Sequence, residues 1–300
     1  MNQKIRNSFW GALCLLLLLI TGNLHTQPGN QIHFMIVKLG DEAANNQTAS
    51  EYLNIISDYF RSKVPGWQDK EMHGWIANQP DSAMWIFEST RPVFAYVPAS
   101  FYIEFLHTSG KTVTPIVQAV RFEKAVDRFY LVTTKEGPAV LSGLHKKTIK
   151  STFGLPHGFL KKLVFPPDFQ PGQHFSLQSS DNLADDMFLM LEAANNAPAV
   201  PEKPPAALLL DDEFKHFFET DEFTWQDVKV IWSSPPLPRE LFVTIGEWRE
   251  KDTHALKSAL LSMKDDPQGA DLLNLMSSSG FVEVNNELLN QTLRKYAAGK

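Results

Sequence analysis

Two short segments of this 300-residue chain carry residues that could bind a small charged ligand. In the first, Ser151 and Thr152 follow a strand-like stretch, residues 148–150, and precede Gly154 and Pro156, which indicate the start of a helix. Hydroxyl groups and free backbone N–H groups at such a turn can bind an anion. The same turn can equally be a plain helix cap, which stabilises a helix by about 1 kcal/mol and binds nothing.

In the second segment, Asp211 and Asp212 end the apolar run 206–210. A carboxylate at the end of a buried strand can accept hydrogen bonds from an amino or ammonium group, whereas the alternative is a solvated loop that caps the next helix. Glu213 and His216 enlarge the acidic group, but an acidic loop with one histidine is not a typical ligand pattern. The sequence therefore predicts no metal site.

Enzyme signatures do not appear in the chain. Residues 109–112 (SGKT) read like the end of a phosphate-binding loop, but Phe105 stands where that motif needs its first glycine. There is no Gly-x-Ser-x-Gly or His-Glu-x-x-His sequence, and the nine histidines are scattered. We therefore expect a protein that is not an enzyme, with no catalytic residues and no cofactor.

The N-terminal residues predict export. Lys4 and Arg6 precede the apolar run 9–20, which is shorter than the ~20 residues of a membrane span and fits a signal peptide over residues 1–26. An uncleaved anchor is the alternative. Cys14, the single cysteine, lies inside this run, so the mature chain would have no disulfide, as in many bacterial periplasmic proteins.

The charge of the chain argues against nucleic acid as a partner. The net charge is −6, and loss of residues 1–26 removes two cations and no acid, which gives −6 − 2 = −8. A chain this acidic, without a basic run, binds nucleic acid or anionic membranes poorly.

Apolar runs rich in β-branched residues alternate with helical patterns, which is typical of an α/β fold with mostly parallel sheets. The predicted strands are 32–39, 93–97, 113–122, 128–134, 148–150, 206–210, 228–232 and 241–243. Helices are predicted from Ser50, and over 81–89, 101–106, 183–191, 255–263 and 270–276.

The stretch from Val228 to Val243 reads as strand, proline-broken segment and strand. With the segments 98–105 and 150–156, this order resembles the periplasmic solute-binding proteins of ABC importers, especially the phosphate/phosphite/phosphonate-binding family. The resemblance implies a type 2 periplasmic binding protein-like fold with two lobes, each a mostly parallel sheet flanked by helices, joined by two crossover hinge segments. Lobe 1 would comprise residues 27–114 and 232–300, and lobe 2 residues 115–231, with crossovers near Thr114 and Trp232.

The resemblance also implies a ligand site in the cleft between the lobes. The family's anion-binding turn corresponds to Ser151 and Thr152, but Phe153 replaces a serine there, and the stretch around Ser180 lacks the family's histidine. The family's tyrosine falls near Phe101. The expected ligand-binding residues are Ser100, Phe101, Tyr102, Ser151, Thr152, Phe153, Ser180 and Asp211.

These features predict a monomeric periplasmic protein that captures a small anionic or zwitterionic solute, phosphonate-like or related, and delivers it to an ABC permease by hinge closure. The missing histidine and Phe153 motivate an alternative: a sensory or interaction protein on the same fold, which signals to a membrane receptor.

Overall fold

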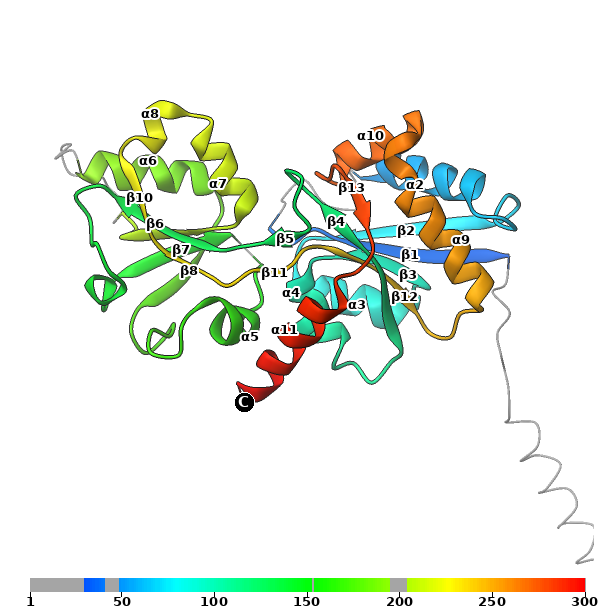
Figure 1. The fold of residues 1–300 in the computed structure, drawn as a ribbon, viewed down its shortest axis with the longest axis horizontal. Helices are drawn as coiled ribbons and strands as arrows, with labels where there is room; N and C mark the ends of the chain where they lie inside the picture. The colour runs from blue at the N-terminus through cyan, green and yellow to red at the C-terminus, as the bar shows by residue number, and fades with distance from the viewer. Residues whose placement is uncertain (1–29, 41–48, 153, 195–203, 300) are drawn as a thin grey trace, which may run out of the picture.

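The computed structural model describes residues 30–40, 49–152, 154–194 and 204–299, and it has two lobes connected by two crossing segments (Figure 1). The first lobe holds a six-stranded sheet of order β13-β4-β12-β3-β1-β2, and the second lobe a five-stranded sheet of order β10-β6-β9-β7-β8. Because β1 and β13 share a sheet, the first lobe is built from both ends of the described chain. The segment predicted as a signal peptide, 1–26, lies outside the described residues.

The elements have the following bounds. The strands of the first lobe are β1 (Gln31–Val37), β2 (Glu71–Ala77), β3 (Phe94–Val97), β4 (Val113–Val120), β12 (Leu241–Ile245) and β13 (Gly280–Val282). Those of the second lobe are β6 (Tyr130–Thr134), β7 (Thr148–Thr152), β8 (Ser176–Ser180), β9 (Ala207–Leu210) and β10 (Val228–Ser233). The crossing segments carry β5 (Val126–Asp127) and β11 (Leu237–Pro238).

The helices cover both sheets (Figure 1). In the first part of the chain they are α2 (Ser50–Lys63), α3 (Pro80–Thr90), α4 (Ala99–Phe101), η1 (Tyr102–Leu106) and η2 (Leu141–Leu144). The middle part holds α5 (His157–Phe159), η3 (Leu160–Val164), α6 (Leu183–Ala194), α7 (Asp212–Glu219) and α8 (Glu222–Trp225). The C-terminal part holds α9 (Glu250–Leu261), η4 (Met263–Asp265), α10 (Pro267–Leu275) and α11 (Asn286–Ala298). None of these helices is long and apolar enough to span a bilayer.

The predicted α/β class is confirmed, but the sheets are mixed rather than mostly parallel. Strand β1 runs parallel to β2 and β3, and β7 runs parallel to β8 and β9. Every antiparallel ladder in the two sheets includes β4, β6, β10 or β12. These strands carry the chain toward or away from a crossing, so the return between the lobes is what introduces the antiparallel direction.

The two crossings lie side by side and pair with each other. Strand β5 pairs antiparallel with β11, with Asp127 opposite Leu237. Thr114, where the sequence suggested the first crossing, instead pairs with Thr244 inside the first sheet. The apolar run continues along β4, so the chain leaves the first sheet only after Val120. At the second crossing, the chain leaves the second sheet after Ser233, the last residue of β10.

The first sheet is fixed by a cluster of aromatic rings. Phe94 of β3 stacks on Phe34, Trp67 and Phe242, with ring centroids 5.2, 5.6 and 5.5 Å apart. Phe60 of α2 meets Phe94 edge to face at 5.3 Å. Aromatic pairs in these geometries stabilise a core beyond their buried area. They hold β1, β3 and β12 in register, and the ends of these strands reach the site described next.

Candidate functional site

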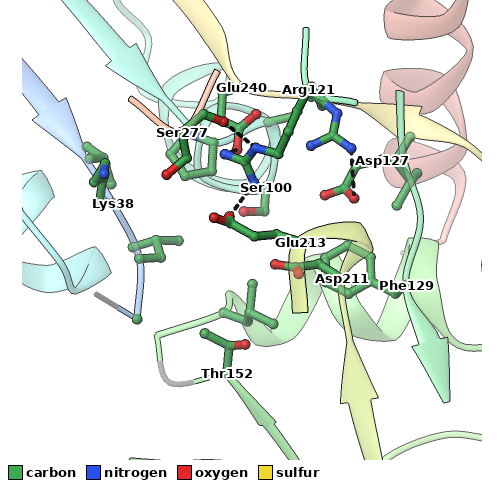
Figure 2. A pocket seen from close by; sticks show the side chains of 18 of the residues that line it. Lys38, Ser100, Arg121, Asp127, Phe129, Thr152, Asp211, Glu213, Glu240 and Ser277 are labelled. Atoms are coloured by element: carbon green, nitrogen blue, oxygen red, sulfur yellow. Dashed lines mark hydrogen bonds and ion pairs between the residues drawn. The ribbon is translucent and has the colours of Figure 1, made fainter. Parts of the chain in front are cut away.

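A cavity of about 480 Å³ lies between the two lobes and is lined by residues of both (Figure 2). The first lobe contributes the ends of β1 and β3, where Lys38 and Ser100 lie, together with Ser277. The second lobe contributes the ends of β7 and β9, with Thr152 and Asp211. This is the position at which open α/β sheets bind ligands, outside the carboxyl ends of their strands.

Apolar and charged side chains both line the cavity, and the charged ones carry both signs. The lining includes three cations, which are Lys38, Arg121 and Arg239. It also includes five carboxylates, which are Asp127, Asp181, Asp211, Glu213 and Glu240. The formal charge of this lining is therefore 3 − 5 = −2, because the acidic side chains outnumber the cationic ones.

Arg121, at the end of β4, has partners on both lobes (Figure 2). Its Nη1 donates to the carboxylate of Glu213 on α7, and its Nη2 lies 3.2 Å from Oε1 of Glu240. Its Nε donates to the carbonyl oxygen of Ser277 at 2.5 Å. Only 12% of the side chain is exposed, so this cation is already neutralised inside the protein.

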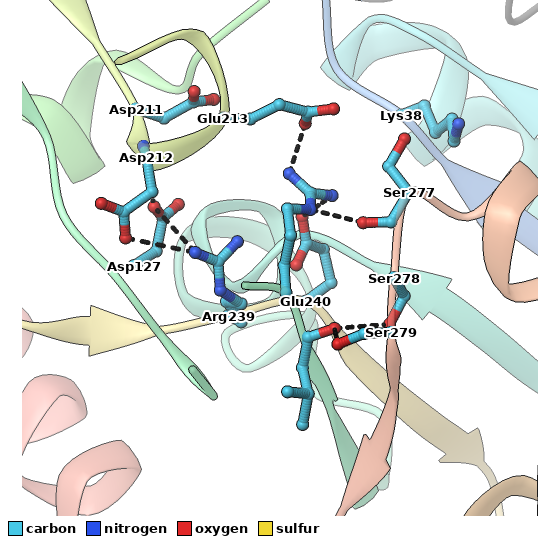
Figure 3. Close-up of polar contacts among 12 residues, drawn as sticks. Lys38, Asp127, Asp211, Asp212, Glu213, Arg239, Glu240, Ser277, Ser278 and Ser279 are labelled. Carbon is cyan, nitrogen blue, oxygen red and sulfur yellow. Dashed lines mark hydrogen bonds and ion pairs between the residues drawn. The ribbon is translucent and has the colours of Figure 1, made fainter. Parts of the chain in front are cut away.

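Arg239, in the second crossing, is almost completely buried, with 2% of its surface exposed. Its Nη2 lies 3.1 Å from Oδ2 of Asp212 and 3.8 Å from Oδ1 of Asp127 (Figure 3). Its Nε donates to the carbonyl oxygen of Val126 at 3.0 Å, which ties one crossing to the other. Neutralisation by two carboxylates is what permits a guanidinium to be buried here.

Three buried polar atoms in the cavity lining have no hydrogen-bond partner among the described residues. They are Oη of Tyr96, Nη1 of Arg239 and Oε2 of Glu240. Burial raises the pKa of Tyr96, so its hydroxyl keeps its proton and can donate. An unsatisfied buried polar group costs about 1–3 kcal/mol, so a ligand that offers both acceptors and donors here would recover stabilisation.

Asp211 connects β9 to α7. Its Oδ1 accepts a hydrogen bond from the backbone N–H of Phe214 at 2.8 Å, so Asp211 caps α7, which is the role that the sequence left open as the alternative to ligand binding. Burial raises the pKa of Asp211 to about 6, and the nearby charge of Glu213 acts in the same direction. The pKa of Asp127 is also raised well above its usual range, first by burial and then by the charge of Asp211. A positive ligand group beside these carboxylates would favour their charged forms.

The acidic side chains at the start of α7 do not converge on one point. Among the described residues, no group of three or more His, Cys, Asp or Glu side chains is placed so that it could hold a metal ion. His216 instead stacks on Phe122, with ring centroids 4.1 Å apart.

Three of the predicted ligand-binding residues line the cavity: Ser100, Thr152 and Asp211. Ser151 does not line it. Successive residues of a strand point to opposite faces, so the side chain of Ser151 lies on the other face of β7 from Thr152, where it is buried. Ser180 is also buried, and its hydroxyl donates to Asp186 at 2.5 Å.

The two aromatic residues predicted beside Ser100 belong to the core. Phe101 is fully buried and its ring contacts Phe105, whereas Tyr102 is 3% exposed and its ring contacts His107. Each helical residue is rotated by about 100° from the one before it, so Ser100 faces the cavity and the next two residues do not. Phe153 lies outside the described residues.

Several residues of the cavity were not predicted from the sequence, notably Tyr96, Arg121, Asp127, Arg239 and Glu240. One signal could have found two of them. Arg239 and Glu240 directly follow the proline-broken segment and precede an apolar strand, where a charged pair needs a buried partner.

Comparison with known proteins agrees with this fold. Residues 195–289 match the family described as the periplasmic substrate-binding protein of ABC phosphonate transporters. The resemblance predicted from the sequence is confirmed. The match covers β9 and α7 of the second lobe, the second crossing, and the return into the first lobe, so it supports the predicted role as a substrate-binding component of this transporter class. No curated protein sequence matches the chain.

Solved structures extend the likeness to nearly the whole chain. The XAC2383 protein from Xanthomonas citri, bound to a chloride ion, is 12% identical, with a TM-score of 0.68 over 90% of this chain and 99% of that one. A binding protein component of an ABC phosphonate transporter from Pseudomonas aeruginosa is 13% identical, with a TM-score of 0.60 over 90% and 89%. PhnD1 from Prochlorococcus marinus, in complex with methylphosphonate, is 14% identical, with a TM-score of 0.59 over 90% and 98%. At these identities the likeness establishes the two-lobed fold and not the ligand.

Proposed function

We propose that this protein captures a small zwitterionic solute in the cleft between its lobes and delivers it to an ABC permease. The observation that carries the proposal is the composition of the cavity wall, in which five carboxylates surround three cations. In this proposal the chain is exported to the periplasm through the N-terminal signal peptide and works as a monomer without catalysis.

An amino group of the solute would bind to Asp211. Among the described residues, that carboxylate accepts a hydrogen bond from the backbone N–H that it caps and from no other group, so it retains acceptor capacity toward the cavity. The acid group of the solute would meet the donors at the base of the cleft, Nη1 of Arg239 and the hydroxyl of Tyr96, with Ser100 and Thr152 as further donors.

A solute with negative charge alone would fit this cleft less well. Arg121 and Arg239 are both paired with carboxylates of the protein, so an anion would have to compete with Glu213, Glu240 or Asp212 for them. Like charges in a partly buried site repel, and an unpaired carboxylate next to the anion would add to that cost. A zwitterion avoids the cost because its amino group compensates Asp211.

Closure would rotate one lobe toward the other about the paired crossings β5 and β11. Both strands are two residues long, so few backbone dihedral angles have to absorb the motion. Because the solute would contact both lobes at once, it would bind the closed form better and shift the population toward it.

Calorimetry with matched solutes tests the proposal. We expect 2-aminoethylphosphonate and amino acids to bind more tightly than ethylphosphonate, phosphate or an aliphatic sulfonate. Hydrogen bonds to charged groups contribute about 1.5–3 kcal/mol, so loss of the amino group should weaken binding roughly 10- to 100-fold. In Asp211→Asn the aminated and non-aminated solutes should bind alike. A folded protein that binds none of these solutes would contradict the proposal.

Uptake measurements separate transport from the sensory alternative. Cells that lack this protein should lose uptake of the solute that calorimetry identifies. Normal uptake together with tight binding would favour a protein that reports on the solute to a membrane receptor.

A further inference from the structure

Two acidic residues at the start of α7, Asp212 and Glu213, contact the two crossings. Both are labelled in Figure 3. Asp212 contacts Arg239 of the second crossing, and Glu213 contacts Arg121 at the beginning of the first crossing. Consecutive residues of one helix in the second lobe are thus ion-paired to two arginines that are far apart in the sequence. The two pairs nevertheless differ in how they are held.

The Asp212–Arg239 pair lies at the pivot between the lobes. Arg239 is bound to Val126 of the other crossing, and the backbone N–H of Asp212 donates to Oδ1 of Asp127 at 3.2 Å. All of these groups are on the crossings or directly beside them, so a rotation about β5 and β11 displaces them little. Only 1% of the Arg239 side chain and 13% of the Asp212 side chain are exposed.

The Glu213–Arg121 pair is built differently. The Glu213 side chain is 45% exposed, whereas Arg121 keeps Glu240 and the Ser277 carbonyl as partners on its own side of the cleft. If Glu213 moved away with the second lobe, Arg121 would stay paired and Glu213 would become hydrated. Neither group would be left buried and unpaired, which is the costly outcome.

A tight turn brings a second contact to the same helix. The backbones of Arg121 and Lys124 exchange two 2.9 Å hydrogen bonds, and Phe122 and Glu123 between them both have positive φ angles, 50° and 61°. This conformation is unfavourable for residues other than glycine and persists only where the surrounding structure imposes it. The turn presents the Phe122 ring to His216, which lies one helical turn after Glu213 on the same face of α7.

We propose that Arg121 and Phe122, on one side, and Glu213 and His216, on the other, form a clasp that holds the lobes together when no solute is bound. The Asp212–Arg239 pair persists as the pivot through opening. The inference rests on the proposed closure of the cleft and adds that the closed form is held in part by the protein's own contacts. The clasp determines how often the cleft opens, and therefore the rates at which a solute binds and dissociates.

Spin-label distances in the full chain without solute test the clasp. Glu88→Cys on α3 and Glu192→Cys on α6 place one label on each lobe, and Cys14→Ser removes the native thiol. We expect one narrow distance distribution in this background. Adding Glu213→Lys, which places a cation beside Arg121, should produce a second distribution, and the milder Glu213→Gln should raise the open population about two- to fivefold.

Glu219→Lys is the matched control, because it makes the same charge change on the same helix but removes only the pairing with Lys215. It should leave the distances unchanged. Raising the salt concentration to about 1 M, where the screening length is about 3 Å, should open the parent protein and have little effect on Glu213→Gln. Identical distributions in the parent, Glu213→Lys and Glu219→Lys would overturn the clasp. That result would leave the proposed function standing, because calorimetry measures solute binding separately.

Discussion

Replacing Asp211 by asparagine should stabilise the protein without solute while removing its preference for amines. Asparagine is about as good as aspartate at the first position of a helix, so the hydrogen bond from Phe214 is retained. What the substitution removes is the cost of a buried negative charge. This cost is visible in the pKa of Asp211, which burial raises from 3.8 to about 6.

The size and sign of the effect follow from that shift. Between about pH 4 and pH 6, folded Asp211 keeps a proton that unfolded Asp211 releases, so the free energy of unfolding falls as the pH rises through this window. A shift of about two units corresponds to about 3 kcal/mol, and the full penalty applies above pH 6. Asp211→Asn should therefore be more stable than the parent by up to about 3 kcal/mol at pH 8 and nearly equal to it at pH 4.

Urea denaturation of both proteins between pH 4 and pH 8 measures this difference. The difference between the two proteins cancels the contributions of the other titrating groups to the free energy of unfolding, because these groups are the same in both proteins. Asp211→Ala serves as a control, because it also removes the charge but loses the helix cap, which costs about 1 kcal/mol at every pH. A difference between Asp211→Asn and the parent that does not change with pH would refute the assignment of the penalty to this carboxylate.

Two further predictions concern residues around the same cleft, and a third concerns the packing of α10. Thr152→Ala should weaken binding of 2-aminoethylphosphonate about 2- to 10-fold in calorimetry, whereas Ser151→Ala, one residue earlier but outside the cavity, should leave it unchanged. Asp212→Ala should lower the free energy of unfolding, measured in urea, by about 3–5 kcal/mol, because the buried guanidinium of Arg239 loses a carboxylate partner. A loss below about 1 kcal/mol would show that this ion pair does not stabilise the protein. Gly269→Ala should lower the free energy of unfolding by about 1–3 kcal/mol, because the new Cβ would lie 2.0 Å from the carbonyl oxygen of Met263. An unchanged midpoint of thermal unfolding would contradict this close packing.

Elements with a continuous apolar run or a clear cap could be predicted from the sequence. Strands β1, β3 and β9 are buried along nearly their whole length, and their runs of apolar residues predict them. Strand β2 escaped prediction because it lies at the edge of its sheet, half exposed, and its sequence contains His73 and Gly74. Alternating apolar and polar residues would indicate such a half-buried strand, but the alternation is broken here because Trp75, Ile76 and Ala77 are consecutive apolar residues.

The candidate site could be located to within a helical turn or a strand residue, but not more closely. The choice between Ser151 and Thr152 depends on which face of β7 meets the other lobe, and the choice among Ser100 and its neighbours depends on the rotation of a short helix. Neither the face of β7 that meets the other lobe nor the rotation of the helix can be predicted from the neighbouring residues in the sequence. The pairing of Arg121 with Glu213 joins residues 92 positions apart, so it appears only once both lobes are assembled.

The charges of the cleft divide into those that the protein has already neutralised and those left for a solute. Two unit charges 4 Å apart interact by about 4 kcal/mol at an effective dielectric constant of 20, so a lone arginine in this wall would attract any anion strongly. Here both arginines are ion-paired with carboxylates of the protein. Arg239 pairs with Asp212 at the pivot, and Arg121 pairs with Glu213 across the cleft. The third cation of the lining, Lys38, donates to the carbonyl oxygen of Leu275. The other groups that face a solute include a carboxylate whose pKa is raised to about 6 and a few hydroxyl and guanidinium donors. The arginines therefore serve mainly to hold the lobes in place. The preference for one solute over another then depends on Asp211, which favours an amine over a bare anion.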